Sequence, residues 1–153
     1  MEKKNKMGSQ VLVMEIKDGK MDHVWADEAE YWEHQRVKSM SNGDMLAEFH
    51  ETFNVVKDEA GTVLQIKLIE EEFEELMESD NKLNTLKEMA DLVYVVYGLA
   101  DRNGWDLDEA IRRVHISNMS KLDPVTRTPI LREDGKILKS EAYKEPDLKD
   151  LVK

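Results

Sequence analysis

Cysteine is absent from this chain of 153 residues, which excludes disulfides, thiolate nucleophiles and cysteine-ligated zinc sites. The sequence also lacks an apolar run of about eighteen residues, the length that a membrane-spanning helix needs. A signal-peptide pattern is missing as well. We therefore expect a cytoplasmic protein, in a cell or in an infected host, that has no membrane partner.

Familiar catalytic motifs are missing too. The sequence contains no Gly-x-x-x-x-Gly-Lys phosphate loop, no Gly-x-Ser-x-Gly elbow and no His-Glu-x-x-His zinc motif. Positive charge is scarce, because 22 lysines and arginines stand against 33 acids and leave a net charge of −11. Such a chain is unsuited to the backbone of a nucleic acid, so we expect no nucleic-acid partner. A nucleotide whose phosphates arrive with Mg²⁺ is still compatible with this charge.

The abundant acids concentrate in residues 68–100, where two periodic apolar segments flank a turn at Ser79-Asp80-Asn81. Apolar residues at steps of three and four predict two helices that pack as an antiparallel hairpin. We assign to the seam between these helices Ile66, Ile69, Phe73 and Leu76 from the first and Leu86, Met89, Val93, Val96 and Ala100 from the second. At about 100° per residue, Glu71 and Glu74 then share one face away from the seam, and Glu88 and Asp91 share another.

A run of glutamates is most often a solvated helix face. Asp91 indicates a functional site rather than a solvated face, because it is the only charged residue between Met89 and Ala100 in a helix that is apolar almost all round. Such a helix is buried, and a buried carboxylate needs a proton, a base or a cation. Lys87 is the only local base, and the neighbouring Glu88 would repel Asp91. We therefore expect a divalent cation rather than an ion pair.

Four acids follow a pattern of Glu-x-x-Glu, thirteen further residues and Glu-x-x-Asp, namely Glu71, Glu74, Glu88 and Asp91. This pattern resembles the metal-binding signature of the MazG-like all-α nucleoside triphosphate pyrophosphohydrolases, a superfamily that includes phosphoribosyl-ATP pyrophosphohydrolase and the dimeric dUTPases. Val114–Leu122 and motifs within residues 134–148 are similar to its short stand-alone members. The resemblance covers roughly residues 44–151.

The resemblance implies Mg²⁺-dependent attack of water on the α-phosphorus of a nucleoside triphosphate, which releases pyrophosphate and a monophosphate. It assigns all four acids of the pattern to the metal, and Mn²⁺ is a possible substitute for Mg²⁺. Glu70 and Glu71 become the catalytic candidates that activate the water. Asn118 and Lys121 follow the superfamily's Asn-x-x-Lys pattern and become the phosphate-binding candidates.

The substrate that we expect is a nucleoside triphosphate, with a mild preference for a purine deoxynucleotide such as dGTP or dATP. Phosphoribosyl-ATP is the alternative within the same enzyme class. An alternative from another class is an acidic helical protein-interaction module, in which the glutamates form a solvated face. Asp91 discriminates between them, because an interaction module has little reason to keep a lone acid in an apolar helix.

The fold that we expect is an all-α helical bundle built on the antiparallel hairpin, with a small C-terminal β-hairpin-like appendage. It forms a single domain over residues 1–153, with an N-terminal extension (1–43), a helical core (44–122) and the appendage (123–153). So few helices cannot cover every apolar face, so we expect a homodimer or homotetramer.

Local signals place the remaining elements. Predicted outside the hairpin are a short strand over Val11–Ile16, a turn at Asp18-Gly19, a helix over Ala26–Lys38, a helix over Met45–Asn54 after a capping turn, a helix over Leu107 to about Lys121, and a turn at Glu133–Lys136 between two short apolar segments. Capping-box patterns predict that the acidic helix starts at Thr62 and that the last helix opens after Asp106.

Overall fold

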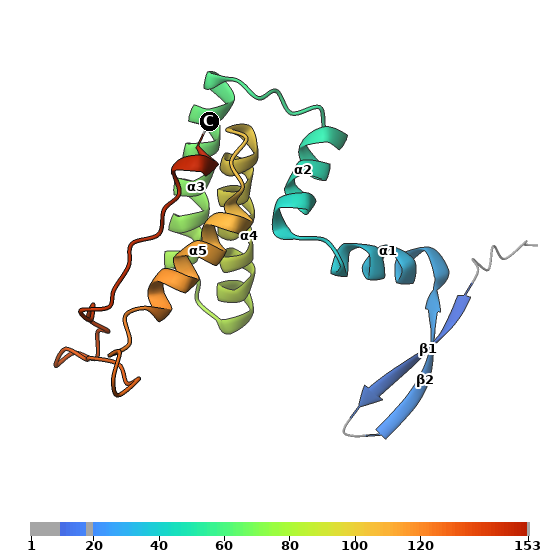
Figure 1. Ribbon diagram of the computed structural model, residues 1–153. Coiled ribbons are helices and arrows are strands. Elements are labelled where there is room, and N and C mark those ends of the chain that lie inside the picture. Colours follow the sequence, from blue (N-terminus) through green and yellow to red (C-terminus); the bar gives the residue numbers. More distant parts are fainter. Residues whose placement is uncertain (1–9, 18–19, 153) are drawn as a thin grey trace, which may run out of the picture. The chain divides into compact units, whose positions relative to one another are not determined.

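The computed structural model describes residues 10–17 and 20–152. In this part of the chain the elements follow the order β1 (Gln10–Lys17), β2 (Lys20–Asp27), α1 (Glu28–Lys38), α2 (Asn42–Thr52), α3 (Glu59–Glu78), α4 (Lys82–Arg102), α5 (Leu107–Met119) and a short 3-10 helix, η1 (Lys149–Leu151) (Figure 1). The chain divides into two compact units between Met40 and Ser41. Each unit is described by itself, and the predicted boundaries of a single domain stay a prediction.

The first unit contains a β-hairpin that the sequence did not predict. β1 and β2 pair antiparallel, with Gln10 opposite Asp27 and Lys17 opposite Lys20. One strand over Val11–Ile16 was expected, so β1 is longer than predicted and its partner β2 was not predicted. Propensity alone is a weak signal for strands, because pairing with a neighbour supplies most of their stabilisation.

Asp27 connects this hairpin to α1. Its carboxylate accepts hydrogen bonds from the backbone N–H groups of Ala29 and Glu30 at 3.0 and 3.1 Å, which makes it the helix cap. The helix therefore begins two residues later than the predicted Ala26. The predicted turn at Asp18-Gly19 lies outside the described residues.

The second unit is all-α in its regular structure, and its centre is the predicted antiparallel hairpin of α3 and α4, which Figure 1 shows side by side. α3 ends at Glu78 and α4 begins at Lys82, so the predicted turn at Ser79-Asp80-Asn81 is confirmed. The Asn81 side chain accepts hydrogen bonds from two backbone N–H groups of the first turn of α4, both at 3.0 Å. A local cap thus determines where the second helix starts.

The predicted start of α3 at Thr62 is wrong. The helix begins at Glu59, because the Asp58 carboxylate accepts a hydrogen bond from the backbone N–H of Gly61 at 2.7 Å and caps it. The Thr62 hydroxyl donates to the Asp58 carbonyl at 3.1 Å instead of capping. Gln65, the other half of the predicted capping box, is buried against α4.

Gln65 fastens the open end of the hairpin. Its Nε2 donates to the Val95 carbonyl at 2.9 Å, and its Oε1 accepts from Arg102 Nε at 2.9 Å. The side chain is 4% exposed, so these hydrogen bonds satisfy an amide that has little water around it. Gly98 provides the space, because a Cβ at this position would lie 2.6 Å from Gln65 Nε2.

α2 and α5 begin with caps in the segments where the sequence predicted them, but α2 runs over Asn42–Thr52 and so starts three residues before the predicted Met45. Ser41 and Asp44 form a reciprocal capping box at the start of α2. The Asp106 carboxylate accepts from the Glu109 N–H at 2.8 Å, so α5 opens after Asp106. Gly104 adopts a φ of 68° after the end of α4, as expected for the residue that stops a helix. α5 ends at Met119, two residues before its predicted end.

His50 of α2 is buried against the end of α4. Its Nδ1 lies 2.6 Å from Asp101 Oδ2, and Lys57 Nζ lies 2.8 Å from the same oxygen. Burial raises the pKa of Asp101, but the hydrogen bonds from Lys57 and His50 outweigh it and hold this pKa below its ordinary value. The three side chains therefore join α2 to α4 through one ionised carboxylate.

The predicted C-terminal β-hairpin is not present as strands. The turn lies where expected, with Gly135 at a φ of 84°, but the only ladder pairing in residues 123–152 is an isolated bridge between Leu131 and Ile137. A lone two-stranded ribbon is marginal in water, and no further strand extends this one.

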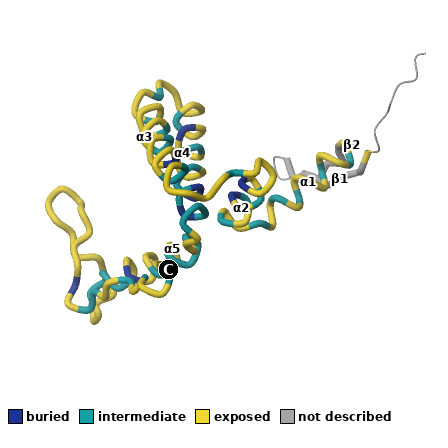
Figure 2. Tube along the Cα trace, turned by 90° about the horizontal axis from the view of Figure 1, so that it is seen from above, coloured by how far each residue is buried: buried dark blue, intermediate teal, exposed yellow. Residues whose placement is uncertain are grey.

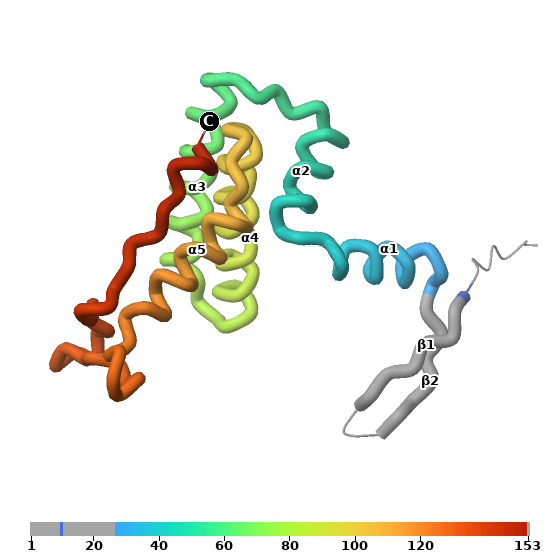
Figure 3. The backbone as a smooth tube through the Cα atoms, in the orientation of Figure 1, coloured from blue at the N-terminus to red at the C-terminus, as the bar shows by residue number. Residues whose placement is uncertain are grey.

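The rest of the tail follows α5, as Figure 3 shows in red beside orange. Ser117 Oγ donates to the Lys144 carbonyl at 2.7 Å, and the Lys144 N–H donates to Ser120 Oγ at 2.9 Å. Arg113 donates to the Asp147 carbonyl at 2.8 Å and forms an ion pair with Asp150. Side-chain and backbone hydrogen bonds and an ion pair thus attach this segment to α5.

Few residues are buried (Figure 2). Among those whose burial is described, the buried hydrophobic residues are Leu46, Tyr97 and Ala100. Many large apolar side chains on α3, α4 and α5 are exposed instead. In the described part of the chain, no helix combines the length and the apolar character that crossing a membrane requires.

The contact between Gly98 and Gln65 generates a prediction with an unusual sign. In most helix interiors Gly→Ala stabilises by about 1 kcal/mol. Here we expect Gly98→Ala to destabilise by about 1–3 kcal/mol, because the added methyl group collides with the Gln65 amide. Urea unfolding of both single variants and of the double variant with Gln65→Ala measures the coupling. In the Gln65→Ala background, Gly98→Ala should be neutral or stabilising, and a stabilising effect in the wild type would contradict the prediction.

Candidate metal site

The seam between α3 and α4 is marked by three side-chain pairings. Gln65 bonds to α4 near one end, the Ser79 and Thr85 hydroxyls lie 2.9 Å apart near the turn, and Glu72 lies close to Glu88 between them. Gln65, Glu72 and Ser79 are each seven residues apart, which places them on one face of a helix at nearly two turns per step. The seam therefore contains carboxylates.

This seam differs from the predicted one. Phe73 and Leu86, which the apolar periodicity placed between the helices, are 53% and 65% exposed. Leu86, Met89 and Val93 instead line an apolar groove between α4 and α2. The periodicity identified a real apolar stripe on α4 but assigned it to the wrong neighbour.

Three acids converge in the middle of the seam. Glu72, Glu75 and Glu88 each offer a carboxylate oxygen, and these atoms all lie within 4.8 Å of one another. Glu88 is buried, Glu72 is half-buried and Glu75 is exposed. The group thus has one side inside the hairpin and one side open to solvent.

The acids predicted from the first helix are their neighbours. Glu71 and Glu74 are exposed and stand outside this group, since each lies one residue, about 100° of rotation, before a member of it. The two acids of α3 in the group are therefore still three residues apart, as predicted, but each lies one position later in the chain. The signal was present in the sequence, because Glu72-x-x-Glu75 fits the same pattern with twelve residues before Glu88.

Asp91 is less buried than the sequence predicted. Its side chain is 41% exposed, and Lys87 Nζ lies 2.9 Å from its Oδ2. The expectation of a buried acid without a basic partner was wrong, because α4 has an open face at this position and the lysine reaches Glu88 and Asp91 together. Because Asp91 is exposed and paired with Lys87, its burial no longer argues for a metal ion at this residue. Asp91 still lies beside the other acids.

Electrostatics connects Asp91 to the group. Burial makes the largest contribution to the raised pKa of the Glu72 carboxyl, and the charges of Glu75, Asp91 and Glu88 raise it further, while Lys87 lowers it. The acids of α3 and α4 therefore share one negative field. A divalent cation would relieve this mutual repulsion.

The donor set suits a hard cation. Mg²⁺ takes oxygen ligands and is usually held by a few carboxylates, while waters and phosphates complete its octahedron. The acids on these two helices supply only carboxylate oxygens, from a group that is open on one side. The ammonium of Lys87 already contacts two acids of α4, Glu88 and Asp91.

The other predicted site residues lie apart from this group. Glu70 is exposed on α3, Asn118 is exposed near the end of α5, and Lys121 follows α5 and is half-buried. Among the described residues, no hydrogen bond or ion pair joins Asn118 or Lys121 to the acids. Their predicted contacts with phosphate stay a prediction.

Comparison with protein families identifies the helical unit. Residues 46–118 match the family model described as phosphoribosyl-ATP pyrophosphohydrolase. These residues are thus similar to the phosphoribosyl-ATP pyrophosphohydrolase domain. The family belongs to the MazG-like all-α nucleoside triphosphate pyrophosphohydrolase superfamily, so the predicted resemblance is confirmed. Its chemistry is that of a pyrophosphohydrolase, a hydrolase that acts on phosphoric anhydrides. The comparison with curated proteins finds no match.

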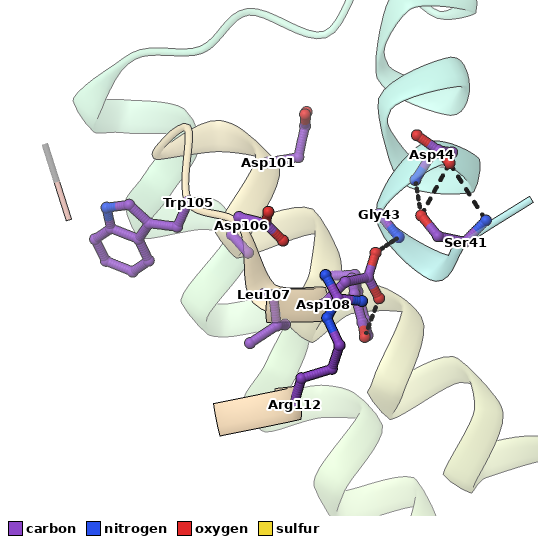
Figure 4. Close-up of a pocket in the computed structure, with 11 residues that line it drawn as sticks. Ser41, Gly43, Asp44, Asp101, Trp105, Asp106, Leu107, Asp108 and Arg112 are labelled. Carbon is purple, nitrogen blue, oxygen red and sulfur yellow. Dashed lines mark hydrogen bonds between the residues drawn. The ribbon is translucent and has the colours of Figure 1, made fainter. Parts of the chain in front are cut away.

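A second hollow of the family domain, of about 340 Å³, lies where α2, α4 and α5 meet (Figure 4). Asp108 at its wall accepts hydrogen bonds from the Gly43 N–H at 3.1 Å and from the Tyr97 hydroxyl at 2.9 Å. Burial raises the pKa of Asp108, but hydrogen bonds from Ser41, Tyr97 and Gly43 hold it below its ordinary value. The Asp108 carboxylate is thus occupied in joining three helices.

The shifted register generates a direct test. We predict that Glu72→Gln raises the melting temperature of the metal-free protein, because it removes one of several like charges. The corresponding gain in the free energy of unfolding should be less than about 1 kcal/mol. The same variant should lose most of the stabilisation that excess Mg²⁺ or Mn²⁺ provides over EDTA.

Glu74→Gln is the matched control, because it makes the same charge change on the same helix outside the group. It should leave both melting temperatures close to those of the wild type. A metal response that survives in Glu72→Gln and disappears in Glu74→Gln would restore the original register.

Proposed function

We propose that this protein is a Mg²⁺-dependent nucleotide pyrophosphohydrolase whose site lies in the α3–α4 seam. The observation that carries the proposal is the convergence of Glu72, Glu75 and Glu88 from two helices of a pyrophosphohydrolase-family domain. Enzymes of this family are typically Mg²⁺-dependent. The alternative of an acidic interaction module loses its support, because the family match explains the acids without a partner protein.

The residues that would hold the metal are Glu72, Glu75, Glu88 and Asp91. This set keeps two of the predicted ligands and replaces Glu71 and Glu74 by their neighbours in the chain. When bound there, Mg²⁺ would neutralise phosphate charge and lower the pKa of a coordinated water, and Mn²⁺ has similar ligand preferences.

The chain's own side chains would complete the reaction. Glu70 and Glu71 are exposed carboxylates that precede Glu72 on α3, and they are our candidates for the base that accepts the proton of the attacking water. Glu71 lies about 100° of rotation from Glu72 and Glu70 about 200°, so Glu71 is the nearer of the two. Asn118 and Lys121 are three residues apart, Asn118 in the last turn of α5 and Lys121 just past its end, and they have no side-chain partner in the described structure. An amide and an ammonium at this spacing can bind one phosphate, and Lys121 would stabilise the charge of the leaving pyrophosphate.

The substrate that the comparisons favour is phosphoribosyl-ATP, because the matching family is described by that activity. We therefore place it ahead of the purine deoxynucleoside triphosphates that the sequence favoured. Both substrates present an adenine or other purine, a sugar and a triphosphate to the metal. The acids would act on the triphosphate, so other residues must determine the specificity for the base and the sugar.

A panel of substrates tests class and specificity together. We expect Mg²⁺-dependent release of pyrophosphate from at least one member of a set that contains phosphoribosyl-ATP, dATP, dGTP, dUTP and the ribonucleotides. Phosphoribosyl-ATP should give the highest kcat/KM. Glu75→Gln should reduce turnover by about a hundredfold or more, whereas Glu74→Gln should change it only a few-fold. Release of orthophosphate, or no release in the whole panel, would contradict the proposal.

We also propose that the chain assembles with copies of itself. Large side chains such as Leu83, Leu86 and Phe73 are more than half exposed. Exposed apolar surface of this extent is characteristic of an interface. A homodimer or homotetramer would cover these faces.

Light scattering measures the assembly. We expect a molar mass that is two or four times the 17.8 kDa of one chain at micromolar concentration. Leu86→Glu places a charge in this surface and should shift the mass towards the monomer, while Glu74→Gln is a control that leaves the apolar surface intact. A wild-type mass near that of one chain would defeat this proposal and would leave the chemistry untouched.

A further inference from the structure

Lys87 has an unusual environment for a surface lysine. Its Nζ lies 3.0 and 3.1 Å from the two carboxylate oxygens of Glu88 and 2.9 Å from Asp91 Oδ2. Three carboxylate oxygens therefore surround one ammonium group. The side chain nevertheless remains 60% exposed, so it can leave this position without moving the helix.

Ordinary helix geometry does not account for this arrangement. Residues i and i+1 point in different directions, so Lys87 must bend around the helix to reach Glu88. The i, i+4 contact with Asp91 has the lysine before the acid, which is the less favourable order relative to the helix dipole. The attraction therefore comes from the charges of Glu88 and Asp91, and the charge of Lys87 also lowers the pKa of Glu72 on α3.

We propose that Lys87 is an internal counter-ion that occupies the acid site until a divalent cation displaces it. The proposal rests on the proposed metal site and adds a residue that is not one of its ligands. Glu88 and Asp91 are the two acids that α4 would offer to the metal, and both are in contact with the ammonium group. Metal binding is then an exchange in which two ion pairs break and the lysine turns into solvent.

This exchange has two consequences of opposite sign. Without metal, Lys87 offsets the repulsion between the acids, so its removal should lower the melting temperature. With metal, Lys87 is a competitor, so its removal should increase metal affinity. A lysine with a purely structural role would shift the melting temperatures with and without metal by the same amount and would leave the affinity unchanged.

The probe is Mn²⁺ alone, and the signal of free Mn²⁺ in electron paramagnetic resonance gives the Kd for the full-length protein. We expect Lys87→Met to bind Mn²⁺ about three- to tenfold more tightly than the wild type, since the two ion pairs are exposed and individually weak. Lys87→Arg keeps the charge and should stay within about twofold of the wild type. Both variants retain the length of the side chain, which protects the helix from a packing defect.

The control for the general loss of positive charge is Lys82→Met. Lys82 is an exposed lysine at the start of the same helix, and screening at physiological salt reduces its influence on the acids. This variant should bind Mn²⁺ as the wild type does. Melting temperatures in EDTA and in Mn²⁺ should show the larger metal-induced rise for Lys87→Met.

The outcomes separate this inference from the proposed function. Equal affinity in the wild type and Lys87→Met, or weaker binding in Lys87→Met, overturns the counter-ion and leaves the metal site standing. An equal gain in Lys82→Met also overturns it, because the effect would then be a matter of net charge. Absence of Mn²⁺ binding in the wild type and all three variants overturns the metal site and the counter-ion with it.

Discussion

The repulsion between carboxylates inside a helical hairpin is the constraint on which the rest of this structure depends. Glu72 and Glu88 occupy positions where a hairpin normally buries apolar side chains, and burial raises the pKa of Glu72. Acids at such positions weaken the contact between the helices unless a positive charge lies among them. Functional sites commonly carry this kind of local cost, which the surrounding structure must offset.

The hairpin offsets the repulsion on both sides of the acids. Towards the open end, Gln65 bonds to the Val95 carbonyl, and near the turn the Ser79 and Thr85 hydroxyls bond to each other. These neutral polar pairs hold the helices together without adding charge. The acids are therefore held close by their neighbours along the seam, as a preorganised metal site requires.

The match to the family model ends within α5. Residues of this helix and its cap also hold the C-terminal tail. Ser117 and Ser120 bind the backbone of the tail around Lys144, and Arg113 forms an ion pair with Asp150. The candidate phosphate residues are Asn118, in the last turn of α5, and Lys121, just past its end. Arg113 is thus engaged with the tail, whereas Asn118 and Lys121 have side chains free of internal partners in the described structure.

Local chemistry in the sequence by itself determined the turn at Ser79–Asn81, the cap at Asp106 and the hairpin, because a cap or a turn depends on hydrogen bonds within a few residues. Only the tertiary structure decided which acids meet. On α3, one residue of rotation, about 100°, exchanges Glu71 and Glu74 for Glu72 and Glu75. Asp91 pairs with Lys87 one turn earlier on the same helix, at a position where α4 is open to solvent. Periodicity reports how apolar each face is, but the partner of a face is settled by the packing of α2 and α3 around α4.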